Sequence, residues 1–282
     1  KYKNREIMGT SHRHKAGPIG APNWGTASAA VTAIANNETA ATELENNPSI
    51  NMPQEVVARR QSVYSRRIRH QYHKAVRFLV RAAGGRDKVS SGQSRAVGRA
   101  GVVWATGIAN AFQEIAEQGL WTWLTRKGIS QGERKSCREI LTIIEDFVKD
   151  YFAGLDETAA SEALEHVMDK VEQKAQGDSE QLEITFNTIV NRDEIKDLLD
   201  DFFGMYIYSH LSQDFKEKLE KDKSMKIADD TMVEIKELIL DDVHRGVAGR
   251  SAERVDWKGP DGENFIKREF NRIIQILTNN ED

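Results

Sequence analysis

The chain has 282 residues, of which 39% are apolar and 30% are charged, and its formal net charge is −4. The single cysteine, Cys137, excludes a disulfide framework and any metal centre built from cysteines, and it fits a reducing cytoplasm. No run of about 18 apolar residues could span a bilayer, and residues 1–15 lack the apolar core of a secretory signal. Composition therefore indicates a soluble protein of one large or two small domains, with no membrane partner.

The charge is divided unevenly along the chain. Residues 1–103 carry 17 Lys and Arg against 6 Asp and Glu, whereas residues 104–282 carry 23 against 38. Residues 56–101 alone hold 12 basic residues and one acid, Asp87. Such a segment repels itself unless it meets opposite charge, which nucleic acid, an acidic partner or the acidic remainder of the chain could supply. The sequence leaves these three alternatives open.

The first 53 residues are predicted to form a flexible tail. Residues 21–53 are rich in Ala, Asn, Thr, Ser and Glu, and their apolar residues are too sparse to offset the entropy cost of ordering. At most a short helix at Ala27–Ala35 is compatible with this composition. We therefore expect that removal of residues 1–50 leaves the fold intact.

Residues 54–101 are predicted to form a basic helix followed by a linker. Pro53 suits the start of a helix, and apolar residues from Val56 to Val80 recur at helical spacing, with arginines over the remaining surface. The Gly84-Gly85 pair ends this helix. The residues from there to Gly101 are rich in Gly, Ser and basic side chains, which is typical of a flexible linker.

Residues 102–282 are predicted to form an acidic helical body. Apolar residues follow the helical period in successive segments, and the most apolar segment, Val102–Lys127, is expected to break near Gly119. No segment alternates with a period of two for long, so no sheet is expected. The predicted fold class is therefore all-α, an irregular helical bundle of about seven helices with a long disordered N-terminal tail.

No motif for catalysis, cofactor binding or metal binding is found. The chain has no nucleophile elbow and no phosphate-binding P-loop, and Cys137 has no convergent histidine to activate it. Neighbouring residues on a helix point about 100° apart and form no carboxylate dyad, so adjacent acids are interpreted as facing solvent. These pairs are Asp200-Asp201, Asp229-Asp230 and Asp241-Asp242. We expect a protein that is not an enzyme and that has no cofactor.

The arginines of the basic segment are the candidate contacts for nucleic acid or for an acidic partner. Tyr64, Tyr72 and Phe78 interleave with them, and arginine together with aromatic rings suits phosphate contact and base stacking. The same pattern is also expected of a helix whose aromatic residues pack inward while its arginines face water. The candidates are Arg59, Arg60, Arg66, Arg67, Arg69, Arg77, Arg81, Arg95 and Arg99.

A motif that resembles a translation start, Met8-Gly9-Thr10-Ser11, lies near the beginning of the chain. Removal of the methionine would leave Gly9 as the terminal amine. N-myristoylation also needs Ser or Thr at the sixth position, where this chain has Arg13, so lipidation is not expected.

The motif is followed by Gly17-Pro18 and by Pro22-Asn23-Trp24, and this order resembles the start of the QatB proteins, the B components of bacterial Qat anti-phage operons. The resemblance continues over most of the chain. It includes a polar spacer, a helix such as Tyr72–Gly84, a Gly/Ser/Arg segment such as Ser94–Gly107, and an acidic helical region such as Ile195–Leu211.

This resemblance implies a non-enzymatic subunit of a bacterial, cytoplasmic defence complex. Qat operons pair the B component with an ATPase, a TatD-like nuclease and a QueC-like enzyme related to 7-deazaguanine biosynthesis. QueC-like enzymes of defence operons are linked to conjugating a deazaguanine base onto an N-terminal glycine. By that analogy Gly9 would be the acceptor, residues 1–8 a removable leader, and the helical body the part that docks partner proteins. Nucleic-acid binding by residues 56–101 is the alternative function.

Overall fold

The structure is a computed structural model that describes residues 22–46, 52–129, 135–149, 157–191, 194–246 and 255–279. These residues contain eleven helices and no strand, which confirms the all-α class and corrects the expected number of about seven helices. The helices are α1 (Pro22–Asn46), α2 (Gln54–Ala82), α3 (Arg86–Ser90), α4 (Arg99–Gln118), α5 (Leu120–Arg126), α6 (Cys137–Lys149), α7 (Glu157–Lys174), α8 (Ser179–Asn191), α9 (Ile195–Asp222), α10 (Met225–Arg245) and α11 (Pro260–Thr278).

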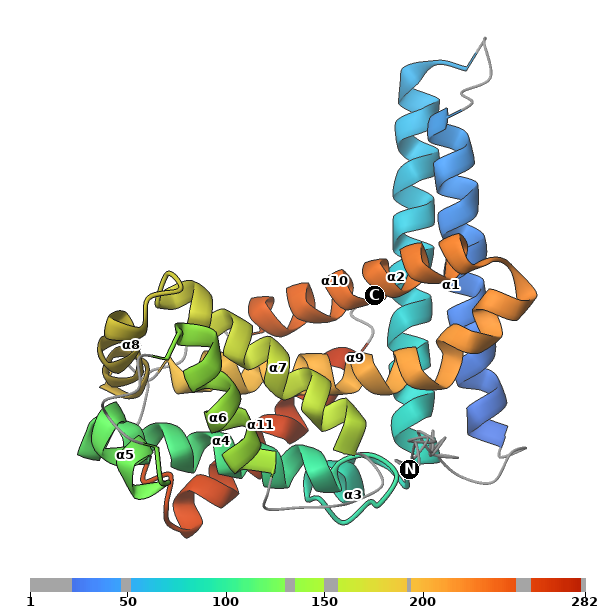
Figure 1. Cartoon of the computed structure of the whole chain (residues 1–282). Helices are drawn as coiled ribbons and strands as arrows, with labels where there is room; N and C mark the ends of the chain where they lie inside the picture. Colours follow the sequence, from blue (N-terminus) through green and yellow to red (C-terminus); the bar gives the residue numbers. More distant parts are fainter. Residues whose placement is uncertain are drawn as a thin grey trace, which may run out of the picture.

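The body is built around α9, which lies between α4, α7, α10 and α11 (Figure 1). Phe202, Phe203 and Tyr206 of this helix are fully buried, and the ring of Phe203 stacks on Phe270 of α11 with 4.3 Å between centroids. Aromatic side chains bury more apolar area than any others, so this cluster supplies much of the stabilisation of the body. Residues 198–207 of this helix are all buried, the carboxylates of Asp200 and Asp201 included, because neighbouring helices cover this stretch on every side.

The predicted basic helix is confirmed as α2, which begins directly after Pro53. Its C-terminal end is followed by Gly84 and Gly85, whose φ angles are +104° and +96°. These angles lie in a region that residues with a Cβ rarely adopt. The amide of Gly85 donates to the carbonyl of Val80 at 2.9 Å, so the glycines end the helix as the sequence predicts.

Helix α1 corrects the prediction that residues 1–53 form a flexible tail. Ala27, Ala30, Val31, Ile34 and Ala35 are all at most 1% exposed, and α1 packs along α2. The buried stripe is made largely of alanine, whose hydrophobicity differs little from that of the polar residues around it. The sequence of α1 therefore shows only a weak helical period. Removal of residues 1–50 is therefore expected to uncover core, and the prediction that it leaves the fold intact is withdrawn. Residues 1–21 lie outside the described residues.

The predicted linker after α2 is instead a packed turn that contains α3. Val89, Ser94 and Val97 are buried. Gly98 has φ +122°, and a Cβ on it would lie 2.2 Å from the carbonyl oxygen of Val89. The glycine therefore serves a close approach of two backbone segments rather than flexibility.

The apolar segment after this turn is divided where the sequence predicts. Gly119, with φ +83°, separates α4 from α5. Both helices remain buried on one side, because Leu120, Trp123 and Leu124 of α5 are at most 1% exposed.

Helices α1 and α2 form a hairpin whose outer half projects from the body (Figure 1). We call this outer half, residues 36–46 of α1 and 54–67 of α2, the arm. None of the arm residues is buried, and Val56 is 39% exposed. From Ile68 onward α2 enters the body, where Tyr72, Val76 and Leu79 are fully buried.

Candidate functional site

Four of the nine candidate arginines lie on the arm. Arg59, Arg60, Arg66 and Arg67 are exposed, and none of them forms an ion pair within the described part of the chain. The Nε atom of Arg66 donates to the carbonyl of Ser62 at 3.5 Å, which is a weak bond. Their positive charge is therefore available to an external anion.

Where α2 enters the body, its side chains bind the acidic helix α10. Arg69 forms ion pairs with Asp242 and, at 3.3 Å, with Asp241, while the hydroxyl of Tyr72 donates to the Asp242 carboxylate. Nε2 of His73 lies 3.4 Å from the same carboxylate. Asp242 is 8% exposed, and a buried carboxylate needs such partners to offset its lost hydration. This part of the basic helix thus meets the acidic body of its own chain.

The protonation state of Tyr72 suits this cluster. Burial raises the pKa of Tyr72, and the hydrogen bond to Asp242 raises it further, so the phenol keeps the proton that it donates. Burial lowers the pKa of His73, while the bond to the Leu277 carbonyl and the charge of Asp242 act in the opposite direction. Nδ1 of His73 donates to the Leu277 carbonyl oxygen 3.0 Å away, so in the neutral ring Nε2 carries no proton and Asp242 is held by Arg69 and Tyr72.

The remaining candidate arginines lie near the C-terminal end of α2 and in the turn that follows. Arg77 donates from Nε and Nη2 to the carbonyl of Thr278, at 3.1 and 2.8 Å, and so joins α2 to the end of α11. Arg81, Arg95 and Arg99 are exposed. The nine candidates therefore do not form one surface, since Arg69 and Arg77 bind within the fold and the others face solvent.

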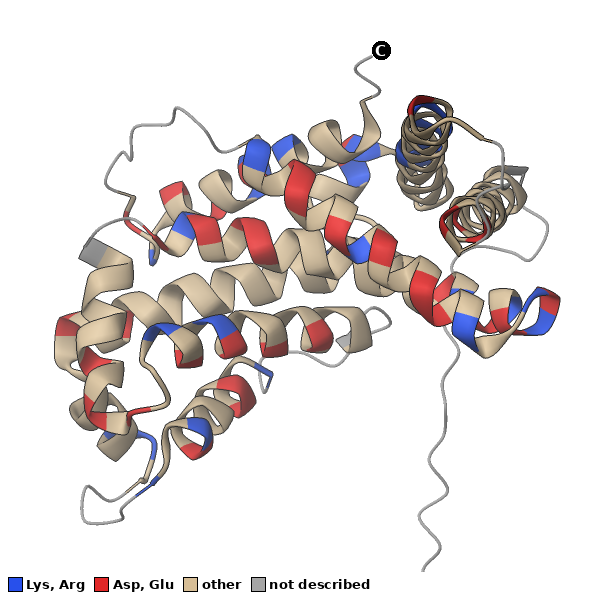
Figure 2. Ribbon diagram, turned by 90° about the horizontal axis from the view of Figure 1, so that it is seen from above, with Lys and Arg blue, Asp and Glu red and all other residues tan. Residues whose placement is uncertain are grey.

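The interpretation of adjacent acids as solvent-facing is correct for one pair only. Asp229 and Asp230 are exposed, as predicted. Asp200 and Asp201, by contrast, are at most 5% exposed, and Asp242 is buried in the cluster described above. Their partners come from other helices: Arg272 pairs with Asp200 at 2.6 Å, Lys170 pairs with Asp201 at 3.6 Å, and Nε2 of His244 lies 2.7 Å from Asp201. Spacing within one helix cannot reveal such partners. Acidic residues along the body helices are seen in Figure 2.

Asp200 is the most deeply buried of these acids. Burial is the main cause that raises its pKa, to about 8, and a hydrogen bond with Glu269 adds to the effect. Arg272 pairs with both carboxylates, so one guanidinium and one shared proton balance two buried acids. This group joins α9 to α11 and lies within the core.

The nucleophile and metal candidates give no site in the described residues. Cys137 is buried, and burial raises the pKa of its thiol, which disfavours the reactive thiolate. No group of three or more His, Cys, Asp and Glu side chains in the described ranges is placed to hold a metal ion. None of the described helices is both long and apolar enough to cross a membrane. The motif Met8-Gly9-Thr10-Ser11 lies outside the described residues.

These observations define an all-α protein in which one helix joins an exposed arm, which carries four arginines and four glutamates, to an acidic body. The family model of the Qat anti-phage system associated protein QatB matches residues 90–277, and the chain belongs to this family. The match covers the body from the end of α3 to α11 and confirms the resemblance seen in the sequence. No curated protein and no solved structure matches the chain. The family makes the chain a component of the Qat anti-phage system.

Proposed function

We propose that this QatB-family protein is a non-enzymatic subunit of a cytoplasmic defence complex, and that its N-terminal segment is a substrate for modification. After removal of residues 1–8, Gly9 would present its amine to a QueC-like enzyme for attachment of a deazaguanine-type base. The helical body would dock the ATPase and the TatD-like nuclease of the same operon. The observation that carries the proposal is the family match over the body.

The position of the motif in the chain suits this role. Gly9 precedes the first described residue, Pro22, by 13 residues. A chain of that length can reach at most about 45 Å from α1, which is enough to enter the pocket of a second protein docked on the body.

Intact-mass spectrometry tests this proposal directly. The protein is purified after expression alone and after expression with its operon neighbours, and the two masses are compared. We expect the second preparation to begin at Gly9 and to carry the extra mass of one deazaguanine-type adduct. A Gly9→Val variant should lose the adduct, whereas a matched Gly17→Ala variant in the same segment should keep it. Identical masses with residues 1–8 retained would refute the proposal.

Docking by the body is tested by the same co-expression. We expect the ATPase or the nuclease to co-purify with a variant that begins at Pro22, because this variant retains every described helix. If both partners are lost on removal of residues 1–21 alone, the body is not their docking surface.

A second candidate function is nucleic-acid binding by the arm. The observation that favours it is the set of four exposed arginines without an ion pair in the described residues, Arg59, Arg60, Arg66 and Arg67. Phosphate contacts release counterions, so affinity should fall steeply with salt. For a 20-base-pair duplex we expect the fourfold Arg→Gln variant to bind at least tenfold more weakly than the wild type. The double variant Arg66→Gln/Arg67→Gln is compared with the exposed pair Lys223→Gln/Lys226→Gln, which removes the same two charges elsewhere. Equal losses of affinity in these two double variants would show that net charge alone, and not the arm, determines binding.

A further inference from the structure

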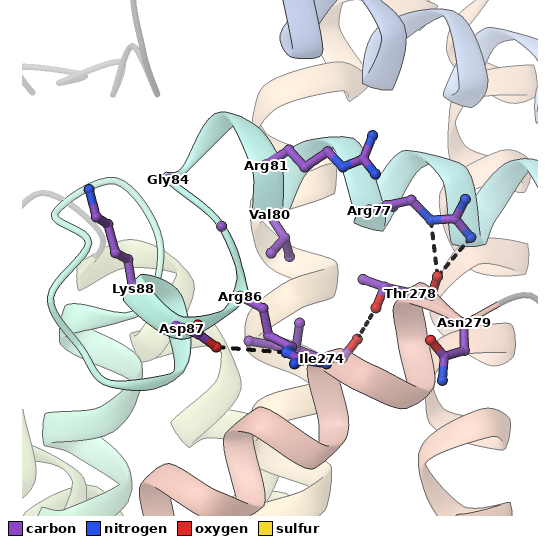
Figure 3. A pocket seen from close by; sticks show the side chains of 11 residues that line it. Arg77, Val80, Arg81, Gly84, Arg86, Asp87, Lys88, Ile274, Thr278 and Asn279 are labelled. Atoms are coloured by element: carbon purple, nitrogen blue, oxygen red, sulfur yellow. Dashed lines mark hydrogen bonds and ion pairs between the residues drawn. The ribbon is translucent and has the colours of Figure 1, made fainter.

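An open cleft of about 910 Å³ lies where α2 ends against α3 and α11 (Figure 3). Its lining includes four cationic side chains, Arg77, Arg81, Arg86 and Lys88, and one carboxylate, Asp87. Val80 and Ile274, both buried, form part of its wall. The volume falls in the range of small-molecule sites in proteins.

The cleft is shaped by the glycine turn described above. Gly84 and Gly85 reverse the chain after α2 and bring Arg86 beneath Arg81 (Figure 3). A Cβ on Gly84 would lie 3.1 Å from Cδ of Lys88, so the lysine stem packs against the turn and Lys88 stands at the edge of the cleft. The cations are thus held on three sides of one space by two helices and a fixed turn.

The cations of the cleft are only partly balanced by the protein. Arg86 has one ion pair, to Asp87, at 3.9 Å, and both side chains are exposed, so this pair is weak. Arg81 forms no ion pair in the described residues, and its guanidinium lies 5.1 Å from the centroid of the Phe78 ring. Arg77 donates from Nε and Nη2 to the Thr278 carbonyl, and these two hydrogen bonds fix its guanidinium at the wall of the cleft (Figure 3).

The negative ends of the two helix dipoles do not neutralise the four cations of the cleft. The C-termini of α2 and α11 both meet the cleft, and each supplies about half a negative charge. Together with Asp87 they offset about two of the four positive charges, which leaves about two uncompensated among the residues that the structure describes. A single carboxylate ligand would satisfy one of these. Guanidinium groups bind phosphate oxygens in bidentate fashion, so a ligand with two or more linked phosphates fits the set better.

We propose that this cleft binds clustered phosphates, with Arg81 and Arg86 as the principal ligands and Arg77 as a fixed third donor. The phosphates could belong to a free nucleoside polyphosphate or to the backbone of a nucleic acid. This site is separate from the arm, because Arg60 and Arg81 are 21 residues apart on one helix, or about 31 Å. The inference does not rest on modification of Gly9.

The test uses the full chain and inorganic tripolyphosphate in isothermal titration calorimetry at 100 mM salt. The wild type should bind, and the double variant Arg81→Gln/Arg86→Gln should bind at least tenfold more weakly. The matched variant Lys223→Gln/Lys226→Gln loses the same charge at the junction of α9 and α10 and should stay within twofold of the wild type. All four residues are exposed, so unfolding midpoints should not change, and circular dichroism checks this.

A second arm of the experiment separates the two sources of phosphate. A fluorescent 12-nucleotide single strand without terminal phosphate is titrated against the same variants. If the cleft variant weakens its binding as well, the ligand is a nucleic-acid backbone; if only tripolyphosphate responds, it is a free polyphosphate. No binding of tripolyphosphate by the wild type at millimolar concentration, or equal weakening of tripolyphosphate binding in the cleft variant and in the Lys223→Gln/Lys226→Gln variant, would overturn the proposal.

Discussion

The outer and inner halves of α2 carry similar numbers of arginines, four against three, but these arginines meet different surroundings. On the arm, Arg59, Arg60, Arg66 and Arg67 face solvent. In the inner half, Arg69 binds the acids of α10 and Arg77 binds the last turn of α11. A basic helix is therefore not one functional unit: Arg69 and Arg77 stabilise the fold, whereas the arm arginines and Arg81 near the C-terminal end of α2 face solvent.

The largest expected difference between arm and body concerns apolar packing. Phe202→Ala in α9 removes a fully buried ring and should lower the free energy of unfolding by about 3–5 kcal/mol. Val56→Ala on the arm should change it by less than about 0.5 kcal/mol, because Val56 is already 39% exposed. Urea unfolding followed by circular dichroism measures both. A loss below about 1 kcal/mol for Phe202→Ala would contradict the central position of α9.

Substitutions where the arm meets the body, at the cluster around Asp242, should have the next largest effect on the free energy of unfolding. Asp242→Ala leaves the buried hydroxyl of Tyr72 without its acceptor and removes the partner of Arg69, so we expect a loss of about 2–3 kcal/mol. Its exposed neighbour provides the control, since Asp241→Ala should cost less than about 1 kcal/mol. Equal effects of the two substitutions would show that burial of Asp242 does not matter. Asp242→Asn, which retains an acceptor, should recover part of the loss.

Within the body, stability should fall as pH rises from 6 to 8. The folded-state pKa of Asp200 is about 8 and its ordinary value about 4, so the folded state holds a proton that the unfolded state releases. The stabilisation is complete below pH 4 and is lost as pH rises through 8, by about 2 kcal/mol between pH 6 and 8. Burial also raises the pKa of Asp214, to about 7, which acts in the same direction.

Thermal unfolding of the Asp200→Asn variant at several pH values isolates the contribution of Asp200. The slope between pH 6 and 8 should become shallower, and the part that remains should combine the contribution of Asp214 with the opposite contribution of His73 and His166, whose pKa values burial lowers. An unchanged slope would show that Asp200 does not hold the proton.

The smallest effect is expected on the arm. The Arg59→Gln/Arg60→Gln variant should unfold within about 0.5 kcal/mol of the wild type, because neither side chain has an ion pair in the described structure. Arg77→Gln in the inner half should cost about 1 kcal/mol, since it loses the hydrogen bonds to the Thr278 carbonyl. If the arm variant is the less stable of the two, the contrast between the halves of α2 is wrong.

Features of the fold that depend on neighbouring residues in the sequence can be predicted from it, whereas contacts between residues far apart in the sequence cannot. The course of α2, its end at Gly84-Gly85 and the break at Gly119 depend on local signals, and the sequence contains them. The burial of α1 depends on alanines that carry almost no periodic contrast. The pairing of Arg69 with Asp242 joins residues 173 positions apart, and the cleft draws on Arg77, Arg86 and Thr278 from three helices. Such contacts depend on tertiary packing, which no local pattern encodes.

The helix shared by arm and body also limits how proteins of this kind can diverge. The family match begins at residue 90, yet Tyr72, Val76 and Leu79 of α2 belong to the same core as the matched helices, so the edge of similarity is not the edge of a folding unit. Outward of Ile68 this constraint ends, because no arm residue is buried. Insertion of seven residues into each helix, placed beyond the Glu38 side chain that hydrogen-bonds to Thr231 of α10, would lengthen the arm by about 10 Å without altering this contact. Evolution could therefore change the length of the arm in steps of two helical turns. The length of the arm would then set the distance between the body and a partner bound at its tip.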